Sequence, residues 1–413
     1  MKKRKGLPHA VVLNSASAGL ATVRGIAEAG ISVTAIAFYS VEPVHFSRFC
    51  KTITLSELKN DQPGLLNWLI AYSKKFELPP VLIPTSDKQA LFIAKYSDLL
   101  SKSYRIWSNS LQKLEGIINK DQLQHLSQRS HIPTIPCIAE PNEAELQQWL
   151  VANKAPFIMK PNYEGTTKSA LKVKNETFLS EDDLLNYVEF HGTSGTVIQR
   201  LLKGGDGNIY DCYGLACRDS KLQSLSTHRR WRQLNPDVGS TTYGEIPASN
   251  DAEFEARLIE LTRVLVEASG FNGIFGVEWL HDPQTDELFI IDFNARPFSS
   301  IGHLHSCGVN LPLLAYYDLI EQRGPNELYS AVATHKFWVD VIRDFWSFGA
   351  KRKSNLITTR QWLISILGCR CCAYWRWYDP LPGTYRMLKF TQLLVGISVK
   401  KISYSLKRLI KKT

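Results

Sequence analysis

Four polar residues in the second half of the sequence have the types and the spacing for metal and phosphate chemistry. Asp292, Asn294 and Arg296 alternate with apolar residues, so an extended strand points all three to one side. Glu278 lies in the preceding apolar segment, which an antiparallel hairpin over 273–293 brings across from them. Two carboxylates and an amide oxygen suit Mg²⁺ with phosphate, and an arginine suits charge that develops during phosphoryl transfer. The alternative is a solvated hairpin face with ordinary cross-strand ion pairs.

Two upstream segments supply groups that suit a nucleotide. Lys160 ends an apolar strand, where a lysine without an anionic partner is rare. The small and polar residues 162–168 that follow allow backbone NH groups to approach phosphates. Segment 197–206 then combines a strand, a linker whose backbone can pair with adenine, and Asp206, which can bind ribose hydroxyls. Taken one at a time, these features also fit ordinary strand ends and turns.

A basic and aromatic run over 227–246 is the third candidate segment. Three arginines and a histidine alternate with Trp231, and Gly239 begins a flexible bend after them. Such a run is most often a solvated face of the protein.

Two kinds of folded unit must position these side chains. Residues 10–37 predict a strand, a small-residue turn, a helix closed by Gly30 and a second strand, which is the opening of a doubly wound α/β domain. A strand at 81–84 and a helix over 88–100 continue that domain. The first turn lacks the three-glycine fingerprint, which counts against a third functional class, a NAD-dependent dehydrogenase.

A second unit begins near residue 116. Strands are predicted at 157–160, 195–199 and 210–217, a helix at 251–269, and the hairpin at 273–293. We therefore predict an α/β protein in three parts. These are a doubly wound domain over 1–115, an α+β domain over 116–325, and a basic, aromatic extension over 326–413.

Charge is unevenly distributed along the 413 residues. The net charge is +10, but residues 351–413 hold 14 Lys+Arg and one acid, Asp379, whereas the first 350 residues carry a net −3. The protein as a whole therefore does not have the charge pattern of a nucleic-acid binder, and no nucleic-acid partner is predicted. Eight cysteines without a paired spacing predict reduced thiols in a cytoplasmic protein. No apolar run reaches the roughly 18 residues of a membrane-spanning helix.

The end of the extension predicts a basic amphipathic helix. A helical apolar stripe, flanked by lysines, is formed by Val395, Val399, Ile402, Leu406 and Leu409. With tryptophans nearby, a helix over 384–413 suits an anionic membrane surface, which would place the protein at the inner face of the cytoplasmic membrane. The alternative is a helix that packs its stripe on the body of the protein.

In this order along the chain, the features resemble the ATP-grasp superfamily over roughly residues 10–310. The resemblance is nearest to carboxylate–amine ligases of the D-aspartate ligase and carbamoyl-phosphate-synthase-like groups, and more distant to D-alanine–D-alanine ligases. It implies an ATP-grasp domain over 116–325, preceded by the α/β domain. It also implies ATP and Mg²⁺, as two ions, as the cofactors.

The resemblance implies roles for individual residues. Lys120 and Lys160 match the two lysines that contact the ATP phosphates. The matches to the phosphate loop are residues 164–168, among them Gly165, Thr166 and Thr167; those to the adenine hinge and ribose are Gln199, Leu202 and Asp206. The matches to the Mg²⁺ ligands are Glu278, Asp292 and Asn294, followed by the catalytic arginine, Arg296. In this family the stretch 227–246 lies near the acyl phosphate, so we expect an arginine there, Arg232, to bind an anion.

Two positions depart from the family pattern. Gln199 and Asp292 stand where the family usually has glutamate; each keeps a usable oxygen, and Asp292 is one methylene shorter. The implied activity is ATP-dependent ligation of a small-molecule carboxylate to an amine through an acyl phosphate, with a cell-envelope or polysaccharide precursor as the substrate suggested by analogy. The alternative is a non-catalytic ATP-binding module of the same fold.

Overall fold

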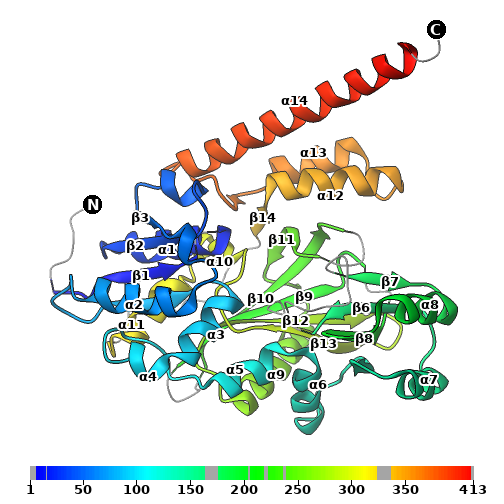
Figure 1. Cartoon of the computed structure of the whole chain (residues 1–413), viewed down its shortest axis with the longest axis horizontal. Coiled ribbons are helices and arrows are strands. Elements are labelled where there is room, and N and C mark those ends of the chain that lie inside the picture. Colours follow the sequence, from blue (N-terminus) through cyan, green and yellow to red (C-terminus); the bar gives the residue numbers. More distant parts are fainter. Residues whose placement is uncertain are drawn as a thin grey trace.

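The computed structural model describes residues 6–14, 16–162, 175–202, 205–217, 222–235, 239–322 and 336–410, with side chains described up to residue 396. Three β-sheets organise these residues. The predicted α/β class is confirmed, because a parallel sheet covered by helices precedes two largely antiparallel sheets (Figure 1).

The first sheet is parallel and has four strands in the order β3-β2-β1-β4. Its strands are β1 (Ala10–Leu13), β2 (Val33–Ala37), β3 (Lys51–Thr54) and β4 (Val81–Pro84). The strands β1, β2 and β4 are buried at every residue, which explains their predominantly apolar sequences. Around them lie α1 (Ser17–Ala27), η1 (Pro43–Phe46), η2 (Ser56–Leu58), α2 (Gln62–Ser73), α3 (Asp87–Lys95) and α4 (Ser97–Leu100).

The second sheet is small and antiparallel, with the strand order β5-β8-β6-β7. Its strands are β5 (Cys137–Ala139), β6 (Phe157–Pro161), β7 (Glu176–Phe178) and β8 (Thr196–Arg200). Two helices, α7 (Glu143–Ala152) and α8 (Glu181–His191), pack on it through a separate apolar cluster that includes Leu146, Leu184 and Phe157. The helices α5 (Leu111–Ile118) and α6 (Lys120–Arg129) lead into this sheet.

The third sheet has seven strands in the order β13-β12-β9-β10-β11-β14-β15. They are β9 (Ile209–Ala216), β10 (Leu222–Gln233), β11 (Thr241–Ile246), β12 (Gly273–Asp282), β13 (Glu287–Asn294), β14 (Lys336–Val339) and β15 (Cys371–Cys372). The predicted hairpin is β12–β13, and α9 (Ala252–Ser269) packs on the sheet beside it. The arginines of the basic run over 227–246 lie on β10, which pairs with both β9 and β11.

The C-terminal extension is built into the third sheet. β14 pairs antiparallel with β11, and β15 pairs parallel with β14, so residues beyond 335 complete the sheet. Two short helices, α10 (Ile301–Ser306) and α11 (Leu311–Leu319), precede these strands and pack against α1 of the first sheet. The predicted boundary at residue 325 falls outside the described residues.

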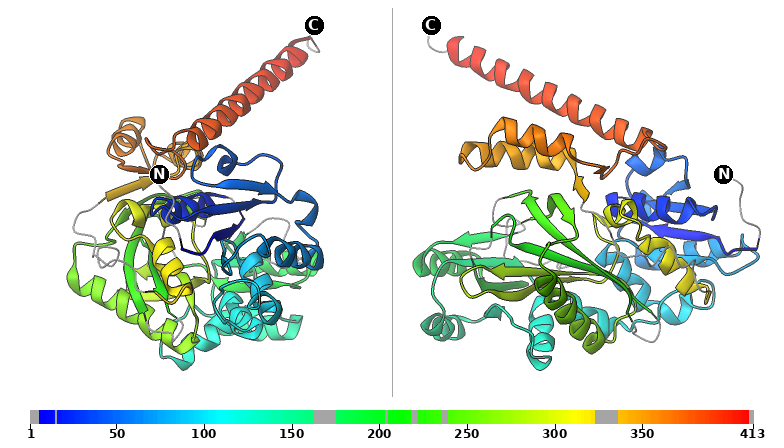
Figure 2. Two further views of the ribbon diagram at one scale, coloured as in Figure 1. Left: turned by 90° about the vertical axis from the view of Figure 1, so that its left-hand side faces the viewer. Right: turned by 180° about the vertical axis from the view of Figure 1, so that it is seen from behind.

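Three helices cover the end of the molecule that the extension forms. They are α12 (Val341–Lys353), α13 (Thr359–Leu367) and α14 (Leu381–Ile410). α12 and α13 lie above the third sheet, and α14 starts beside the first sheet and runs outward past them (Figures 1 and 2). Among the described residues, no helix combines the length and the apolar character needed to cross a membrane. Most of the helix predicted over 384–413 is described as the backbone of α14, whereas most of its apolar stripe lies beyond the described side chains.

Candidate active site

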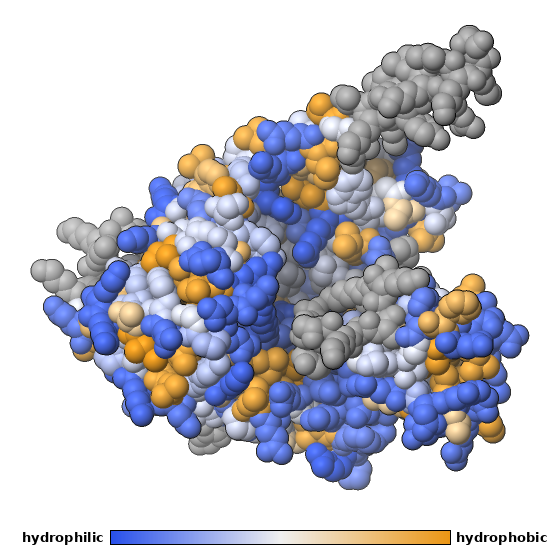
Figure 3. Space-filling view, in the orientation of Figure 1, coloured by the Kyte–Doolittle hydropathy of each residue, from blue (hydrophilic) through white to orange (hydrophobic). Residues whose placement is uncertain are grey.

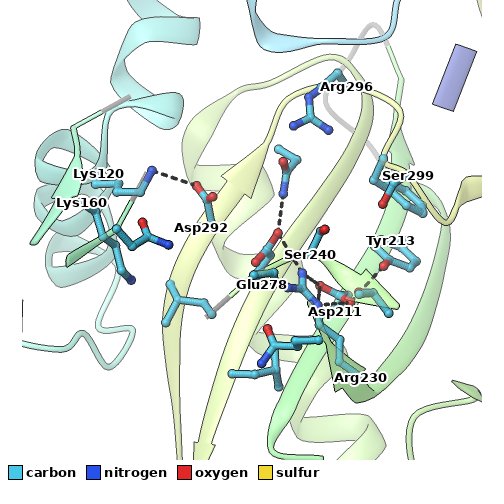
Figure 4. A pocket seen from close by; sticks show the side chains of 18 of the residues that line it. Lys120, Lys160, Asp211, Tyr213, Arg230, Ser240, Glu278, Asp292, Arg296 and Ser299 are labelled. Atoms are coloured by element: carbon cyan, nitrogen blue, oxygen red, sulfur yellow. Dashed lines mark hydrogen bonds and ion pairs between the residues drawn. The ribbon is translucent and has the colours of Figure 1, made fainter. Parts of the chain in front are cut away.

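A cavity of about 390 Å³ lies between the small sheet and the third sheet, and it is lined by six of the residues singled out from the sequence: Lys120, Lys160, Glu278, Asp292, Asn294 and Arg296. Lys120 and Lys160 reach it from one side, and Asp292 and Glu278 from the strands opposite (Figure 4). Arg296 lies farther along the same cavity.

The three predicted Mg²⁺ ligands share one face of the β12–β13 hairpin. Glu278 on β12 lies opposite Asp292 on β13. Asn294 on β13 lies opposite Gly276, which precedes Glu278 by two residues on β12. The Asn294 Nδ2 donates to Glu278 Oε1 at 3.0 Å. The side chains of Asp292 and Glu278 are partly exposed to the cavity, at 33% and 20%.

This donor set fits a hard divalent cation in its chemistry. Two carboxylates and an amide converge on one cavity wall, and oxygen atoms are the ligands that Mg²⁺ prefers. Across the described part of the chain, no group of three Asp, Glu, His or Cys residues is arranged to hold a metal. An amide oxygen from Asn294 would therefore have to complete the set with Asp292 and Glu278.

The two lysines come from different elements and face the same carboxylate. Lys120 is the first residue of α6, whose N-terminus is capped by the Asn119 side chain, and its Nζ lies 3.8 Å from Asp292 Oδ1. Lys160 lies on β6, and its Nζ donates to Gln199 Oε1 on β8 at 3.1 Å. β6 and β8 pair antiparallel, with Lys160 opposite Val197, which brings the side chain of Gln199 within reach.

Burial lowers the pKa of Lys160, and the positive charge of Lys120 adds to this effect, so that the pKa falls to about 8 against the opposing effect of Asp292 and Glu278. A cation that is desolvated in this way gains most from an anionic partner. The pair of lysines therefore forms a cationic wall suited to phosphate groups.

A network of charged residues around Asp211 lines part of the cavity, and the sequence analysis did not predict it. Asp211 on β9 is fully buried, and it accepts two hydrogen bonds from Arg230 Nε, at 2.9 and 3.1 Å, and one from His228 at 2.8 Å. Although burial opposes ionisation, the positive charge of Arg230 holds the pKa of Asp211 well below its ordinary value. Arg230 Nη2 also contacts Glu278 Oε1 at 2.8 Å. The network thus fixes Arg230 directly beside a predicted metal ligand.

The structure places Arg232 apart from the predicted phosphate and metal residues. Two residues after Arg230, its side chain points to the other face of β10, where it is buried against Asp344 with contacts of 2.9 and 2.8 Å. Trp362 Nε1 donates to the same carboxylate at 2.8 Å. Arg232 is absent from the cavity lining. Regular alternation would put residues two apart on the same face of a strand, but the register of β10 against β11 is irregular between Arg230 and Arg232, and this irregularity turns Arg232 away.

Asp206 also lies apart from these residues. Its carboxylate forms an ion pair with Lys351 of α12 and accepts a hydrogen bond from the Gln233 backbone NH at 3.1 Å. It is not among the residues that line the cavity. An aspartate held by the extension in this way ties α12 to the third sheet.

The remaining adenine-side residues do not line the 390 Å³ cavity. Gln199 lines a second, small cavity with Lys120 and Cys137. Leu202 packs with an apolar cluster that includes Ile209 and Leu280. The predicted phosphate-loop residues Gly165, Thr166 and Thr167 lie outside the described residues.

Arg296 links the first domain to the cavity through a contact with Asp87. Its Nε and Nη2 donate to the two carboxylate oxygens of Asp87 at 3.0 and 3.1 Å. Asp87 is the first residue of α3, so this paired contact joins the helix after β4 to the end of β13. The guanidinium of Arg296 still lines the cavity beside Phe298 and Ser299.

Arg343 was not found from the sequence, because it lies in the extension, far from every recognised motif. It lies on α12, lines the same cavity, and donates from Nη1 to Ser240 Oγ at 3.0 Å. Its Nε is 3.7 Å from Asp340, and its side chain is 38% exposed. Asp211 was also missed, although an acid inside an otherwise apolar strand was a usable signal.

Comparison of the whole structure with solved structures identifies the fold. The N5-carboxyaminoimidazole ribonucleotide synthetase solved in complex with ADP superposes with a TM-score of 0.63 and 12% identity, covering 84% of this chain and 86% of that one. The L-amino acid ligase from Bacillus licheniformis superposes with a TM-score of 0.59 and 13% identity, covering 82% and 80%. The chain has the ATP-grasp fold.

A third ATP-grasp structure agrees. Biotin carboxylase from Campylobacter jejuni, in a complex described as β-γ-ATP, superposes with a TM-score of 0.60 and 14% identity, covering 79% of this chain and 74% of that one. No family model matches the sequence, and no curated protein matches it. The likeness is thus carried by the ATP-grasp architecture and not by overall sequence identity.

Proposed function

We propose that this protein is an ATP-dependent carboxylate–amine ligase that forms an amide-type bond through an acyl phosphate. One observation carries the proposal: Lys120 and Lys160 face Glu278, Asp292 and Asn294 across a single cavity of the ATP-grasp fold. Lysines on one side and hard oxygen donors on the other suit a nucleoside triphosphate. Three solved structures of the same fold are complexes with ADP or ATP.

The proposed reaction has two steps. A carboxylate oxygen of the substrate attacks the γ-phosphorus of ATP, the bond from that phosphorus to the β-bridging oxygen breaks, and ADP leaves. An amine then attacks the acyl carbon, phosphate leaves with the C–O bond electrons, and the amine loses a proton to solvent. The protein's contribution is to position the two substrates and to offset negative charge.

Individual residues have distinct tasks in this proposal. Lys120 and Lys160 bind the phosphates of ATP. Glu278, Asp292 and Asn294 would hold Mg²⁺, which supplies charge neutralisation at the phosphates when it is bound. No further residue is needed as a covalent nucleophile.

The acidic substrate is proposed to lie at the arginine-rich end of the cavity. Arg230 and Arg343 approach it from β10 and α12, and Ser240, which precedes β11, accepts a hydrogen bond from Arg343. Arg230 already contacts two carboxylates, whereas Arg343 is half-exposed and makes one contact of 3.0 Å and one of 3.7 Å. Arg343 is therefore the residue proposed to bind the carboxylate substrate, and a cell-envelope precursor stays a prediction for its identity.

The experiment that tests the proposal is a screen of carboxylates and amines for release of ADP and phosphate, with mass spectrometry of the product. We expect turnover only when both substrates are present, and no product with Asn294→Ala. Arg257→Gln, an exposed substitution on α9, is the matched control and should leave turnover unchanged. Nucleotide binding without turnover across the whole screen would contradict the ligase and support the non-catalytic module.

A further inference from the structure

Exposed apolar side chains are concentrated in the C-terminal extension. Of the 21 large hydrophobic residues exposed among the described side chains, 12 lie between residues 346 and 395. Figure 3 shows hydrophobic side chains gathered over the end of the molecule from which α14 projects. An exposed cluster of hydrophobic side chains of this kind indicates a surface that binds another protein or a membrane.

α13 has two opposite faces, and the apolar one points away from the protein. Trp362 and Ser365 face the body, where Trp362 Nε1 donates to Asp344 and Ser365 Oγ accepts from Arg232. Leu363, Ile364 and Leu367 lie on the other side of the helix and are 48%, 60% and 84% exposed. No residue of α13 is buried, although its sequence is mostly apolar. The helix is anchored by polar contacts and presents its hydrophobic face to the surroundings.

The start of α14 extends this apolar surface. Phe390 packs on Phe345 and Trp346 of α12, which fixes the orientation of the helix. Leu388 and Val395 lie on the opposite side and are 60% and 58% exposed. Two tryptophans in the segment before α14, Trp375 and Trp377, are also exposed, at 50% and 78%. Together with the three α13 residues, these four side chains form the surface that we call the apical surface.

The charge around the apical surface selects its partner. Residues 351–413 hold 14 basic residues, and their one acid, Asp379, is buried against Arg24. Exposed basic side chains surround the apolar ones: Arg352, Lys353, Arg360, Arg370 and Lys389. A second copy of the chain would oppose like charges across the contact, whereas anionic lipid headgroups complement them. Tryptophan and leucine beside lysine and arginine are also the composition of interfacial membrane contacts.

We infer that the apical surface, formed by α13, the Trp375–Trp377 segment and the start of α14, binds the surface of a bilayer that contains anionic lipids. The apolar side chains enter the boundary between headgroups and acyl chains, and the basic side chains contact the headgroups. The rest of the protein stays in water, and binding through the apical surface holds the candidate active site near the membrane. This inference does not depend on the proposed ligase activity.

Flotation of the full-length protein with vesicles tests the inference. The vesicles are phosphatidylcholine alone and phosphatidylcholine mixed with phosphatidylglycerol. We expect binding to the anionic vesicles that falls with salt, and at least tenfold weaker binding to the neutral ones. The triple variant Leu363→Gln, Ile364→Gln, Leu367→Gln should lose at least tenfold in affinity for the anionic vesicles, because its α13 face no longer inserts.

The matched control replaces equally exposed hydrophobic residues elsewhere. The double variant Leu179→Gln, Phe190→Gln changes one side chain just before α8 and one on α8, which are 81% and 86% exposed. This variant should bind vesicles like the wild type. Unchanged unfolding temperatures would show that both variants fold. Equal vesicle binding by the triple variant and the wild type would overturn the inference. A wild-type dimer that the triple variant converts to a monomer, without vesicle binding, would overturn it in favour of a contact between copies.

Discussion

At the scale of single residues, the site brings together charged side chains that are spread over more than 200 positions of the sequence. Lys120, Asp292 and Arg343 line one cavity, and each depends on a neighbour for its position. Arg230 illustrates the dependence: Asp211 and Glu278 hold it from two strands. Charges held in this way need little rearrangement to bind a substrate.

Arg343→Gln tests the proposed carboxylate contact. The KM for the carboxylate should rise about tenfold or more while the KM for ATP stays unchanged, because a charge-assisted hydrogen bond contributes about 1.5–3 kcal/mol. Steady-state kinetics with each substrate varied separately gives the two values. Arg352→Gln, on the exposed side of the same helix, is the control. An equal rise in both KM values would contradict a specific role in carboxylate binding.

Lys160 predicts a pH dependence of ATP binding. Its pKa near 8 means that the lysine of the free protein loses its charge as the pH rises through that value. ATP affinity should then fall by up to about tenfold per pH unit above 8, because only the charged form attracts phosphate. Titration calorimetry from pH 6.5 to 9.5 measures the effect. Lys160→Arg stays charged throughout and should flatten the profile.

Lys160 also makes the free energy of unfolding depend on pH, and this dependence has the opposite direction to that of ATP binding. Between pH 8 and the ordinary lysine pKa of 10.5, the unfolded chain binds more protons at this position than the folded chain. The contribution of Lys160 to the free energy of unfolding therefore rises with pH in that window. Comparing denaturant unfolding of the wild type with that of Lys160→Met across the window isolates this contribution, and a fall with pH would contradict it.

At the scale of elements, α12 acts as a clamp on the third sheet. Asp344 accepts hydrogen bonds from Arg232, Thr242 and Trp362, and Ser347 Oγ donates to the Gln233 carbonyl. All of these groups are buried or half-buried beneath α13. The extension therefore supports the strands β10 and β11, which carry the basic side of the site.

Asp344→Ala should destabilise the protein by about 3–5 kcal/mol, because it leaves the buried guanidinium of Arg232 without a counter-charge. Denaturant unfolding measures the change. Asp286→Ala removes an exposed ion pair with Arg257 and should cost no more than about 1 kcal/mol. Similar losses in the two variants would contradict the clamp.

At the scale of the whole molecule, the chain returns to its first domain near the end. Asp379 accepts hydrogen bonds from Arg24 Nε at 2.9 Å and from Ser47 Oγ at 2.8 Å, and all three are buried. The Arg24 Nη2 also donates to the backbone carbonyl of Tyr374 at 2.9 Å. These contacts fix the segment from which α14 projects (Figure 2).

Arg24→Met should release this segment from the first domain. The buried carboxylate of Asp379 loses its counter-charge, so local opening becomes cheaper even where the global fold survives. Hydrogen exchange should show faster exchange over residues 374–385 and unchanged protection in β9 and β12. Unchanged exchange over the segment would contradict the tether.

The sequence by itself determined the parts that local physics fixes. Unbroken apolar runs specified the parallel strands at 10–13 and 81–84, and strand alternation placed Asp292 and Asn294 on one face of a hairpin. These features depend on side-chain period and burial, which a single sequence records. The ATP-grasp resemblance followed from the order of such features along the chain.

Only the tertiary structure decided which of the arginines faces the cavity. Arg230 and Arg232 have the same type and lie two residues apart, and the irregular register of β10 against β11 between them separates their faces. Arg343 and Asp344 are adjacent, yet one lines the cavity and the other is buried under α13. Such choices depend on contacts between elements that are distant in sequence, and the pattern within one element does not contain them.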